Sequence, residues 1–341
     1  MVLYGENGAG KTNVLEALSL FSANRGLRKA PIADLNTIGT PPFSWNLELT
    51  IEQNQYKTLL ATNALNGRRT AKADDSPLSS LAKFEEVLWL LWVVPSMDNI
   101  FISAQSDLRS FFDHLVSGYD FAHKIHLKEL NNLQKERLHV IFYRKDEAWL
   151  QILEEKIAEK NMLIIKSRLE FITLLHETFD RYPSDFLRPI VDISGDVETI
   201  FNTYSEEEAI LEIAAKLKAA RYEDSEKQTT TVSTQKSNWI VKHRKTLLEA
   251  ENCSTGEQKA FLISLILAVV RIYKTRRNGT PVLLLDDLMM HLDKNRRKSL
   301  INELKQLKIQ SFFTGTDLSL FSDVADVAQI YHVQNSICSL E

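Results

Sequence analysis

Hydrophobic and polar positions follow two different spacings along this chain, one typical of strands and one typical of helices. The change from one spacing to the other divides the chain into regions. Before residue 100, short apolar runs are separated by turn-forming stretches. The apolar runs at 2–4 and 87–94 and the alternating segments at 45–51 and 56–61 predict strands. The apolar spacing at 13–20 predicts a helix soon after the first of them.

A long helical region follows. Between 106 and 181, proline is absent, glycine is rare and apolar residues recur at helical spacing. This pattern predicts a pair of long antiparallel helices, interrupted near Lys145 and Asp146. It leaves two interpretations open, an ordinary helical subdomain or a projecting, coiled-coil-like arm. After another predicted helix at 206–221, the stretch 225–237 is rich in Thr, Ser, Gln and Lys, and it predicts a flexible surface loop.

The last part of the chain alternates between helical and strand patterns. The predicted helices lie at 256–273, 294–307 and 318–325, and the predicted strands at 281–285, 310–314 and 329–333. Alternation of this kind favours a mainly parallel sheet covered by helices. The sequence therefore predicts an α/β fold whose two sequence-distant parts are separated by a helical insertion.

A phosphate-binding loop stands between the first predicted strand and the first predicted helix. Its pattern is Gly-x-x-x-x-Gly-Lys-Thr, which lets backbone N–H groups and a helix N-terminus face a polyphosphate. Lys11 is predicted to reach the β- and γ-phosphates of ATP, and the Thr12 hydroxyl to bind Mg²⁺. The predicted nucleotide-binding residues here are Gly5, Glu6, Asn7, Gly8, Ala9, Gly10, Lys11, Thr12 and Asn13.

Two acids end the apolar strand at 281–285. Because ligands of α/β proteins bind at the carboxyl ends of parallel strands, these acids are expected near the phosphate-binding loop. Asp286 is the predicted Mg²⁺ ligand, and Asp287 is the predicted general base that activates the attacking water. Lys11 and Asp287 are thus the candidate catalytic residues.

The segment Ser-Thr-Gly-Glu-Gln-Lys opens the predicted helix at 256–273. Ser254 followed by Glu257 is a capping box, so the segment can be explained as a helix start alone. The functional interpretation is that Ser254, Gly256 and Glu257 face the γ-phosphate of an ATP held by another subunit. The order of motifs along the chain favours the second interpretation.

Composition and charge narrow the possible partners. The formal net charge of −4 argues against a uniformly basic nucleic-acid binder but allows local basic clusters. The two cysteines, Cys253 and Cys338, match no metal-binding spacing, and no signal peptide or membrane-length apolar run is seen. These observations predict a cytoplasmic protein with no membrane contact. The candidate DNA-backbone clusters are Arg68-Arg69, 242–245, Arg271 with Lys274, Arg276 and Arg277, and 296–298.

The ordered motifs resemble those of the RecF family, a group of ABC-type ATPases in which a helical arm splits a nucleotide-binding head. The segments that carry the resemblance are 5–16, 92–101, 253–260, 283–293 and 313–317. The resemblance implies a head at 1–100 and 246–341, a helical arm at 101–185, and a return segment at 186–245. It also implies that the first strands of the head are missing.

The resemblance carries expectations about activity. It implies an ATP-dependent homodimer that binds single-stranded and gapped or junction DNA, hydrolyses ATP weakly, and helps to load a recombinase during repair and replication. RecR-like, RecO-like and RecA-like proteins are the implied partners. Asp293 and Thr316 are implied to sense or complete the dimer site.

The sequence departs from the RecF pattern at four places, which are Ser96, Arg109, 233–238 and Met290. Two alternatives to the RecF function therefore stay open. One is another ATPase of this architecture in a defence or chromosome system, and the other is a truncated relative with low activity.

Overall fold

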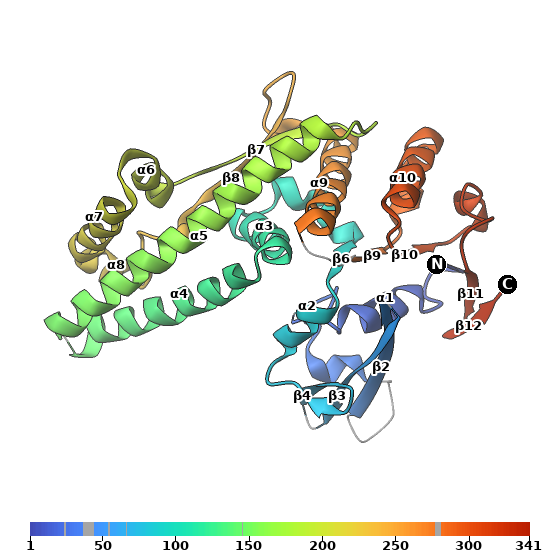
Figure 1. Ribbon diagram of the computed structural model, residues 1–341, viewed down its shortest axis with the longest axis horizontal. Coiled ribbons are helices and arrows are strands. Elements are labelled where there is room, and N and C mark those ends of the chain that lie inside the picture. Colours follow the sequence, from blue (N-terminus) through green and yellow to red (C-terminus); the bar gives the residue numbers. More distant parts are fainter. Residues whose placement is uncertain (24, 37–43, 54, 66, 145, 277–280) are drawn as a thin grey trace. The chain divides into compact units, whose positions relative to one another are not determined.

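The computed structural model describes residues 1–341 except 24, 37–43, 54, 66, 145 and 277–280. The chain forms two compact units (Figure 1). Met1–Met97 together with Asn278–Glu341 make up one unit, which we call the head unit, and Asp98–Arg277 make up the other, which we call the arm unit. This division differs from the predicted boundaries, because the predicted helix at 256–273 groups with the arm unit.

The central sheet of the head unit has the strand order β12-β11-β1-β10-β9-β6. All neighbouring strands run parallel except β12, which is antiparallel to β11. Val2 lies opposite Phe313, which in turn lies opposite Leu285, so the carboxyl ends of β1, β10 and β9 meet at one edge. The strands are β1 (Val2–Tyr4), β6 (Leu90–Val93), β9 (Val282–Leu285), β10 (Ser311–Gly315), β11 (Ile330–Gln334) and β12 (Ile337–Leu340).

The predicted α/β alternation is confirmed in the head unit, with one exception. The helix predicted at 318–325 is wrong, because only the 3-10 turn Leu318–Phe321 forms and turns follow it. The segment has apolar residues at helical spacing, but only Phe321 and Val324 are buried, so little apolar contact stabilises a longer helix. The helices are α1 (Lys11–Ser19), α2 (Phe84–Val87) and α10 (Lys294–Leu307), with further 3-10 turns at Ile32–Leu35, Leu81–Lys83 and Leu288–His291.

An apolar core holds this sheet edge in place. Leu3 of β1, Leu284 of β9 and Phe312 of β10 are buried in one cluster with Leu15 of α1. Burying each such side chain stabilises the fold by about 1.5–3 kcal/mol. Because α1 and three strands share this core, the loop between β1 and α1 has rigid elements on both sides.

A second, antiparallel sheet completes the head unit, in the order β2-β3-β4-β5. The predicted strands at 45–51 and 56–61 are confirmed as parts of two longer strands that pair along their whole length. The strands are β2 (Ser44–Gln53), β3 (Tyr56–Leu65), β4 (Arg68–Ala73) and β5 (Ser76–Pro77).

The arm unit is mainly helical, and its longest helix, α5, lies beside α4 (Figure 1). A π-helical segment at Val140–Arg144 extends α4, which confirms an interruption close to the predicted position. No helix in the described part of the chain is long and apolar enough to cross a membrane. The helices are α3 (Gln105–Tyr119), α4 (Phe121–His139), α5 (Glu147–Arg181), α6 (Asp196–Thr203), α7 (Glu206–Ala219), α8 (Arg221–Lys227) and α9 (Thr255–Arg276), and the strands are β7 (Pro189–Ser194) and β8 (Asn238–His243).

The prediction of a surface loop at 225–237 is wrong. Its first residues belong to α8, and the 3-10 turn Thr234–Lys236 follows later. Thr234 is fully buried, and its N–H and hydroxyl both donate to Asn161 of α5 at 2.8 and 2.9 Å. Buried polar groups with such partners replace the apolar anchors that the sequence lacks.

Candidate nucleotide site

The loop between β1 and α1 has the backbone shape that a phosphate-binding loop needs. Gly5 and Gly10 both have positive φ, of 155° and 106°. A Cβ on Gly5 would lie 2.2 Å from the Val333 carbonyl oxygen, and one on Gly10 would lie 3.3 Å from Ser336 Oγ. Any other residue at Gly5 would therefore clash, and one at Gly10 would be strained.

The first turn of α1 is open to an anion. Gly10 precedes the helix, and no side chain of the described residues caps its first N–H groups. Those N–H groups, together with the helix dipole, favour a negatively charged ligand. The neighbouring loop residues Glu6, Asn7 and Gly8 are exposed, as is Asn13, whose side-chain oxygen accepts from Arg28 at 3.1 Å. Ala9 and Thr12 are half-buried.

Lys11 is buried beneath this loop. Its side-chain ammonium donates to the carbonyl oxygens of Gly5 and Glu6, at 2.7 and 2.9 Å. Both acceptors are neutral main-chain groups, so the positive charge has no carboxylate partner among these bonds. A phosphate group would supply the negative charge that is missing, because an ammonium is costly to bury without one.

Thr12 and Asp286 meet at the carboxyl end of β9. The Thr12 hydroxyl donates to Asp286 Oδ1 at 3.0 Å, and the Asp286 N–H donates to the Val93 carbonyl at 2.9 Å. Hydroxyl and carboxylate oxygens are ligands that Mg²⁺ prefers. The described residues contain no cluster of three or more metal-binding side chains.

Asp287 adopts an unusual backbone conformation beside this pair. Its φ is 49°, in the left-handed region, and its N–H donates to the Thr314 hydroxyl at 2.8 Å. Its Oδ1 is buried without a hydrogen-bond partner among the described residues. Burial raises the pKa of Asp287, the Asp286 charge raises it further, and Lys11 and His291 oppose the shift. A carboxylate with a raised pKa and one oxygen free to accept a proton has the properties of a general base.

The predicted capping box is present at the start of α9, in the arm unit. The N–H and hydroxyl of Ser254 contact Glu257 Oε2 at 2.9 and 2.7 Å, and the Glu257 N–H donates to Ser254 Oγ at 3.3 Å. These bonds lower the pKa of the Glu257 carboxyl. Ser254 and Gly256 are exposed, so the turn has a surface that a ligand can reach.

Comparison with known proteins places these motifs in one family. Residues 1–318 match the family model described as "AAA domain, putative AbiEii toxin, Type IV TA system". A protein of Rhizobium etli (strain CIAT 652), named DNA replication and repair protein RecF, is 34% identical over 339 residues, covering 97% of this chain and 90% of the relative. The chain belongs to the RecF family. A RecF protein of Rickettsia bellii (strain OSU 85-389) is 33% identical over 334 residues, covering 97% and 91%.

Solved structures confirm the predicted fold. One described as "Structure of the recombination mediator protein RecF-ATP in RecFOR pathway" has a TM-score of 0.85 at 22% identity and covers 100% of this chain and 92% of that one. The crystal structure of an SMC head bound to the C-winged helix domain of ScpA has a TM-score of 0.55 at 12% identity, covering 100% and 88%. The fold is that of a RecF-like P-loop ATPase head with a helical arm.

The places where this chain departs from the RecF pattern lie in different surroundings. Ser96 is exposed, in the 3-10 segment Pro95–Ile102, and Met290 is 46% exposed. Arg109 donates to the carbonyl oxygen of Ser237 at 2.8 Å. Two of the departures are therefore joined by a hydrogen bond inside the arm unit.

Some arginines of the predicted basic clusters in this RecF-family chain make contacts within the protein. Arg69 donates to Thr62 Oγ1 at 3.0 Å, and burial lowers the pKa of Arg69 to about 10. The Arg271 guanidinium lies over the Tyr182 ring, 5.3 Å from its centre. Arg69 is thus held by contacts within the head unit, to Thr62 and to the Ser22 carbonyl oxygen, whereas the 242–245 cluster and Arg271 belong to the arm unit.

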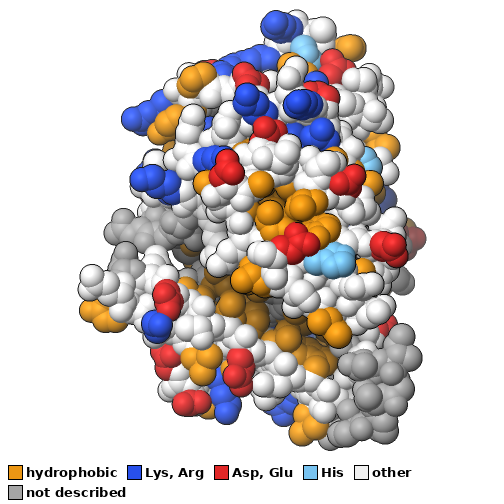
Figure 2. Space-filling view, turned by 90° about the vertical axis from the view of Figure 1, so that its right-hand side faces the viewer, with side chains coloured by type: hydrophobic (Ala, Val, Ile, Leu, Met, Phe, Trp, Pro, Cys, Tyr) orange, Lys and Arg blue, Asp and Glu red, His pale blue; other side chains and the backbone are white. Residues whose placement is uncertain are grey.

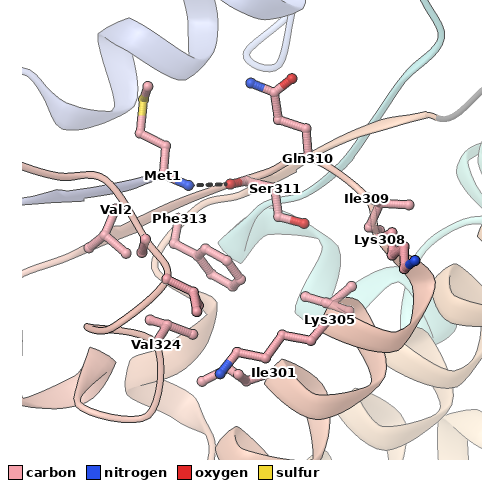
Figure 3. Close-up of a pocket in the computed structure, with 13 residues that line it drawn as sticks. Met1, Val2, Ile301, Lys305, Lys308, Ile309, Gln310, Ser311, Phe313 and Val324 are labelled. Carbon is pink, nitrogen blue, oxygen red and sulfur yellow. Dashed lines mark hydrogen bonds between the residues drawn. The ribbon is translucent and has the colours of Figure 1, made fainter.

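A cavity of about 300 Å³ lies at the opposite end of the parallel strands (Figure 3). It is lined by Met1, Ser311 and Phe313, by Lys305 and Lys308, and by apolar residues of α10 and the following turns. Because it lies at the amino ends of β1 and β10, it is separate from the phosphate-binding edge.

On the side of the molecule where β11 and β12 lie, hydrophobic side chains gather near the middle of the view (Figure 2).

Sequence reasoning gave no role to Thr314, although the structure places it at the centre of the site. The residue ends the apolar run Phe312-Phe313 in β10, and its side chain is fully buried. Because Ser311 of the same buried strand also carries a hydroxyl group, no local pattern distinguishes Thr314.

Proposed function

We propose that this chain is an ATP-dependent DNA-binding protein of recombinational repair and replication-fork maintenance. The observation that carries the proposal is the convergence of Lys11, Thr12, Asp286 and Asp287 at one sheet edge, next to an uncapped helix start. Membership of the RecF family, whose relatives are named DNA replication and repair proteins, supports it.

The residues of the head unit divide the work on ATP. The loop N–H groups and Lys11 bind the phosphates, while Thr12 and Asp286 hold Mg²⁺. When bound, Mg²⁺ would neutralise charge that develops on the phosphate oxygens. Asp287 orients a water molecule and accepts its proton during attack on the γ-phosphorus, which breaks the bond between the β- and γ-phosphates. The water oxygen ends on inorganic phosphate and the leaving oxygen on ADP.

Two copies of the chain complete each site. In the proposed dimer, the 254–257 turn of one copy faces the γ-phosphate bound by the other. The exposed Ser254 hydroxyl and the helix dipole of α9 suit such a contact. ATP then joins the two copies, and hydrolysis releases them. Turnover is slow because the complete site exists only in the dimer.

Dilution tests this mechanism. The ATPase rate per subunit and the sedimentation coefficient would be measured over a range of protein concentrations, with ATP, ADP and no nucleotide. We expect an ATP-dependent dimer, and a rate per subunit that falls when dilution dissociates it. A rate that stays constant far below the dimerisation constant would exclude a site shared between subunits.

The DNA-binding part of the proposal rests on family membership and on the basic clusters of the arm unit. We expect ATP-dependent binding to gapped or single-strand–double-strand junction DNA through backbone contacts, with little sequence preference. The logarithm of affinity should fall steeply with the logarithm of salt concentration. Binding that does not respond to salt would exclude backbone contacts. RecR-like and RecO-like proteins and a RecA-like recombinase are the proposed partners, to be tested by co-sedimentation on gapped DNA.

A defence ATPase is the second candidate, because the matching family model is described by a putative toxin of a toxin–antitoxin system. The two functions predict different cellular outcomes. A repair protein should restore survival after ultraviolet damage to a strain that lacks its own RecF. A toxin should instead arrest growth when it is expressed alone.

A further inference from the structure

Thr314 connects both acids at the end of β9 through one hydroxyl group. Its Oγ1 donates to Asp286 Oδ1 at 2.7 Å and accepts from the Asp287 N–H at 2.8 Å. The side chain is fully buried in β10, which lies between β1 and β9. The hydroxyl therefore uses both its donor and its acceptor capacity on the two residues that the site depends on.

The bond to Asp286 fixes one carboxylate oxygen. Thr12 also donates to Oδ1, at 3.0 Å, so two hydroxyl groups hold the same atom from different elements. If the Thr12 hydroxyl were a ligand of Mg²⁺, the Thr314 bond would remain to orient the Asp286 carboxylate. Groups that orient a metal ligand in this way contribute about 10–100-fold to metal affinity.

The bond to Asp287 fixes a backbone conformation that a residue with a Cβ rarely adopts. Asp287 has φ of 49°, and its N–H would be a buried, unpaired donor without the Thr314 oxygen. The conformation places Oδ1 in a buried position with no partner among the described residues. Loss of the Thr314 oxygen would let the peptide rotate and take this carboxylate with it.

We propose that Thr314 is a positioning residue that sets the direction of both carboxylates. The Mg²⁺ concentration needed for ATP binding then depends on the Thr314 hydroxyl. The inference rests on the proposed nucleotide site but not on dimerisation, hydrolysis or DNA binding. It assigns a role to a hydroxyl that touches neither nucleotide nor metal.

Thr314→Val is the main test variant, because it keeps the branched shape and removes the hydroxyl. Binding of a fluorescent ATP analogue would be titrated with Mg²⁺ at protein concentrations that keep the chain monomeric, and repeated in EDTA. We expect the half-saturating Mg²⁺ concentration to rise by about 10–100-fold, with the affinity in EDTA unchanged. Thr314→Ser restores the hydroxyl and should return the Mg²⁺ dependence to within about threefold of the wild type.

Thr62→Val is the matched control. Thr62 is also a buried threonine of the head unit whose hydroxyl both donates, to the Thr70 carbonyl at 2.9 Å, and accepts, from Arg69 at 3.0 Å. The Thr62→Val protein should lose about as much stability as the Thr314→Val protein. Its ATP binding should keep the wild-type dependence on Mg²⁺. If Thr314→Val does not fold, Thr314→Cys keeps a small side chain with only a weak donor and takes its place.

Three outcomes separate the possibilities. Wild-type Mg²⁺ dependence in a folded Thr314→Val or Thr314→Cys protein would overturn the inference and leave the proposed function intact. Wild-type protein that binds no ATP would overturn the proposed function and the inference together. Faster hydrogen exchange at the Asp287 amide in the variant, without nucleotide, is the expected sign that the peptide has been released, and unchanged exchange would contradict it.

Discussion

Two buried polar clusters, one in each unit, differ in how completely their charges are paired. In the arm unit, the Arg168 guanidinium is fully buried, and each of its nitrogens has an acceptor: Asp113 at 2.9 Å twice, Thr234 O at 2.7 Å and Ser237 Oγ at 3.3 Å. In the head unit, the Lys11 ammonium contacts only neutral carbonyl oxygens, and Asp287 Oδ1 has no partner among the described residues.

The difference shows how to tell a structural cluster from a binding site. A buried charge is costly, so a cluster that serves only the fold should provide every charge with partners. The Arg168 guanidinium is paired in this way, with residues from α3 and from the segment before β8, although Glu198 Oε2 beside Ser237 is buried without a hydrogen-bond partner among the described residues. In the Lys11 cluster, the hydrogen bonds of the ammonium go to neutral carbonyl oxygens, and Asp287 Oδ1 has no hydrogen-bond partner among the described residues, which is the arrangement expected where a charged ligand completes the set.

The pKa values of two aspartates show the same contrast. Burial alone would raise the pKa of Asp113, but the Arg168 charge and the hydrogen bonds from His123 and Arg168 outweigh it and lower the pKa to about 2. The pKa of Asp287 is raised by burial and by its neighbour Asp286. Protonation therefore acts in opposite directions on the stability of the two units.

The largest expected effect is that of breaking the complete cluster. Arg168→Met removes the guanidinium that pairs with the Asp113 carboxylate and leaves His123 as its hydrogen-bond partner, and should lower the free energy of unfolding by about 3–5 kcal/mol. Urea denaturation followed by circular dichroism measures it. The double variant Arg168→Met/Asp113→Leu should recover part of the loss, because no buried charge is left without its partner.

An exposed ion pair supplies the control for this prediction. Arg244 pairs with Asp180 at 2.7 Å, and their side chains are 40% and 63% exposed. Arg244→Met should change the free energy of unfolding by less than about 1 kcal/mol. Equal effects of Arg168→Met and Arg244→Met would show that the buried cluster contributes no more than a surface pair.

Removing the incompletely paired charge should affect binding rather than stability. Lys11→Ala should weaken ATP binding by about 100-fold or more, since hydrogen bonds to charged groups contribute about 1.5–3 kcal/mol each. It should change the free energy of unfolding by less than about 1 kcal/mol, because the loss of the two hydrogen bonds is offset by the removal of a buried charge. Calorimetric titration with ATP measures the first effect and urea denaturation the second.

Lys57→Ala is the matched control, because Lys57 is an exposed head-unit lysine paired with Glu52 at 2.5 Å. It should leave ATP affinity unchanged. A Lys11→Ala protein that is strongly destabilised but binds ATP normally would reverse the comparison and make Lys11 a structural residue.

The contribution of Asp113 to the stability of the arm unit should decrease in acid. The folded pKa of Asp113 is below its ordinary value of 3.8, so its contribution is fully present above about pH 4 and is lost as pH falls toward about 2. The shift corresponds to roughly 2 kcal/mol. We expect Asp113→Asn to be less stable than wild type at neutral pH by about this amount, and the gap to close in acid.

Asp287→Asn should change the pH dependence of stability in the opposite direction. The folded pKa of Asp287 is raised, so its charged form reduces stability at neutral pH, and this cost disappears as pH falls through the raised pKa. Replacement by asparagine should therefore not destabilise the protein at neutral pH. Stability–pH curves of the three proteins test both signs, and parallel curves for wild type and Asp113→Asn would contradict the first.

Local patterns were sufficient to predict the head unit but not the arm cluster. The phosphate-binding loop lies between a strand and a helix that are adjacent in sequence, and the acids at 286–287 end a strand of continuous apolar character. Each could be predicted from a few neighbouring residues. Thr234 could not, because its partner Asn161 lies on a different element and only the folded chain brings the two together. Thr314 could not for the same reason, since its partners are on β9's end.

A small expected effect on stability, at the start of α9, decides between the two interpretations of that turn. Ser254→Ala removes a helix cap and should lower the free energy of unfolding by about 1 kcal/mol. Ser254→Asp keeps a good cap but places a negative charge where the proposed γ-phosphate of the other copy would bind. If the turn only caps the helix, the alanine variant alone should have a phenotype.

The proposed shared site predicts the opposite ranking. Ser254→Asp should then be as stable as wild type in urea and yet fail to form the ATP-dependent dimer in sedimentation experiments, while ATP binding to its own head unit stays normal. An aspartate variant that dimerises normally with ATP would leave the capping box as the function of Ser254. The turn would then belong with the Arg168 cluster, as a group of polar residues that serves the fold alone.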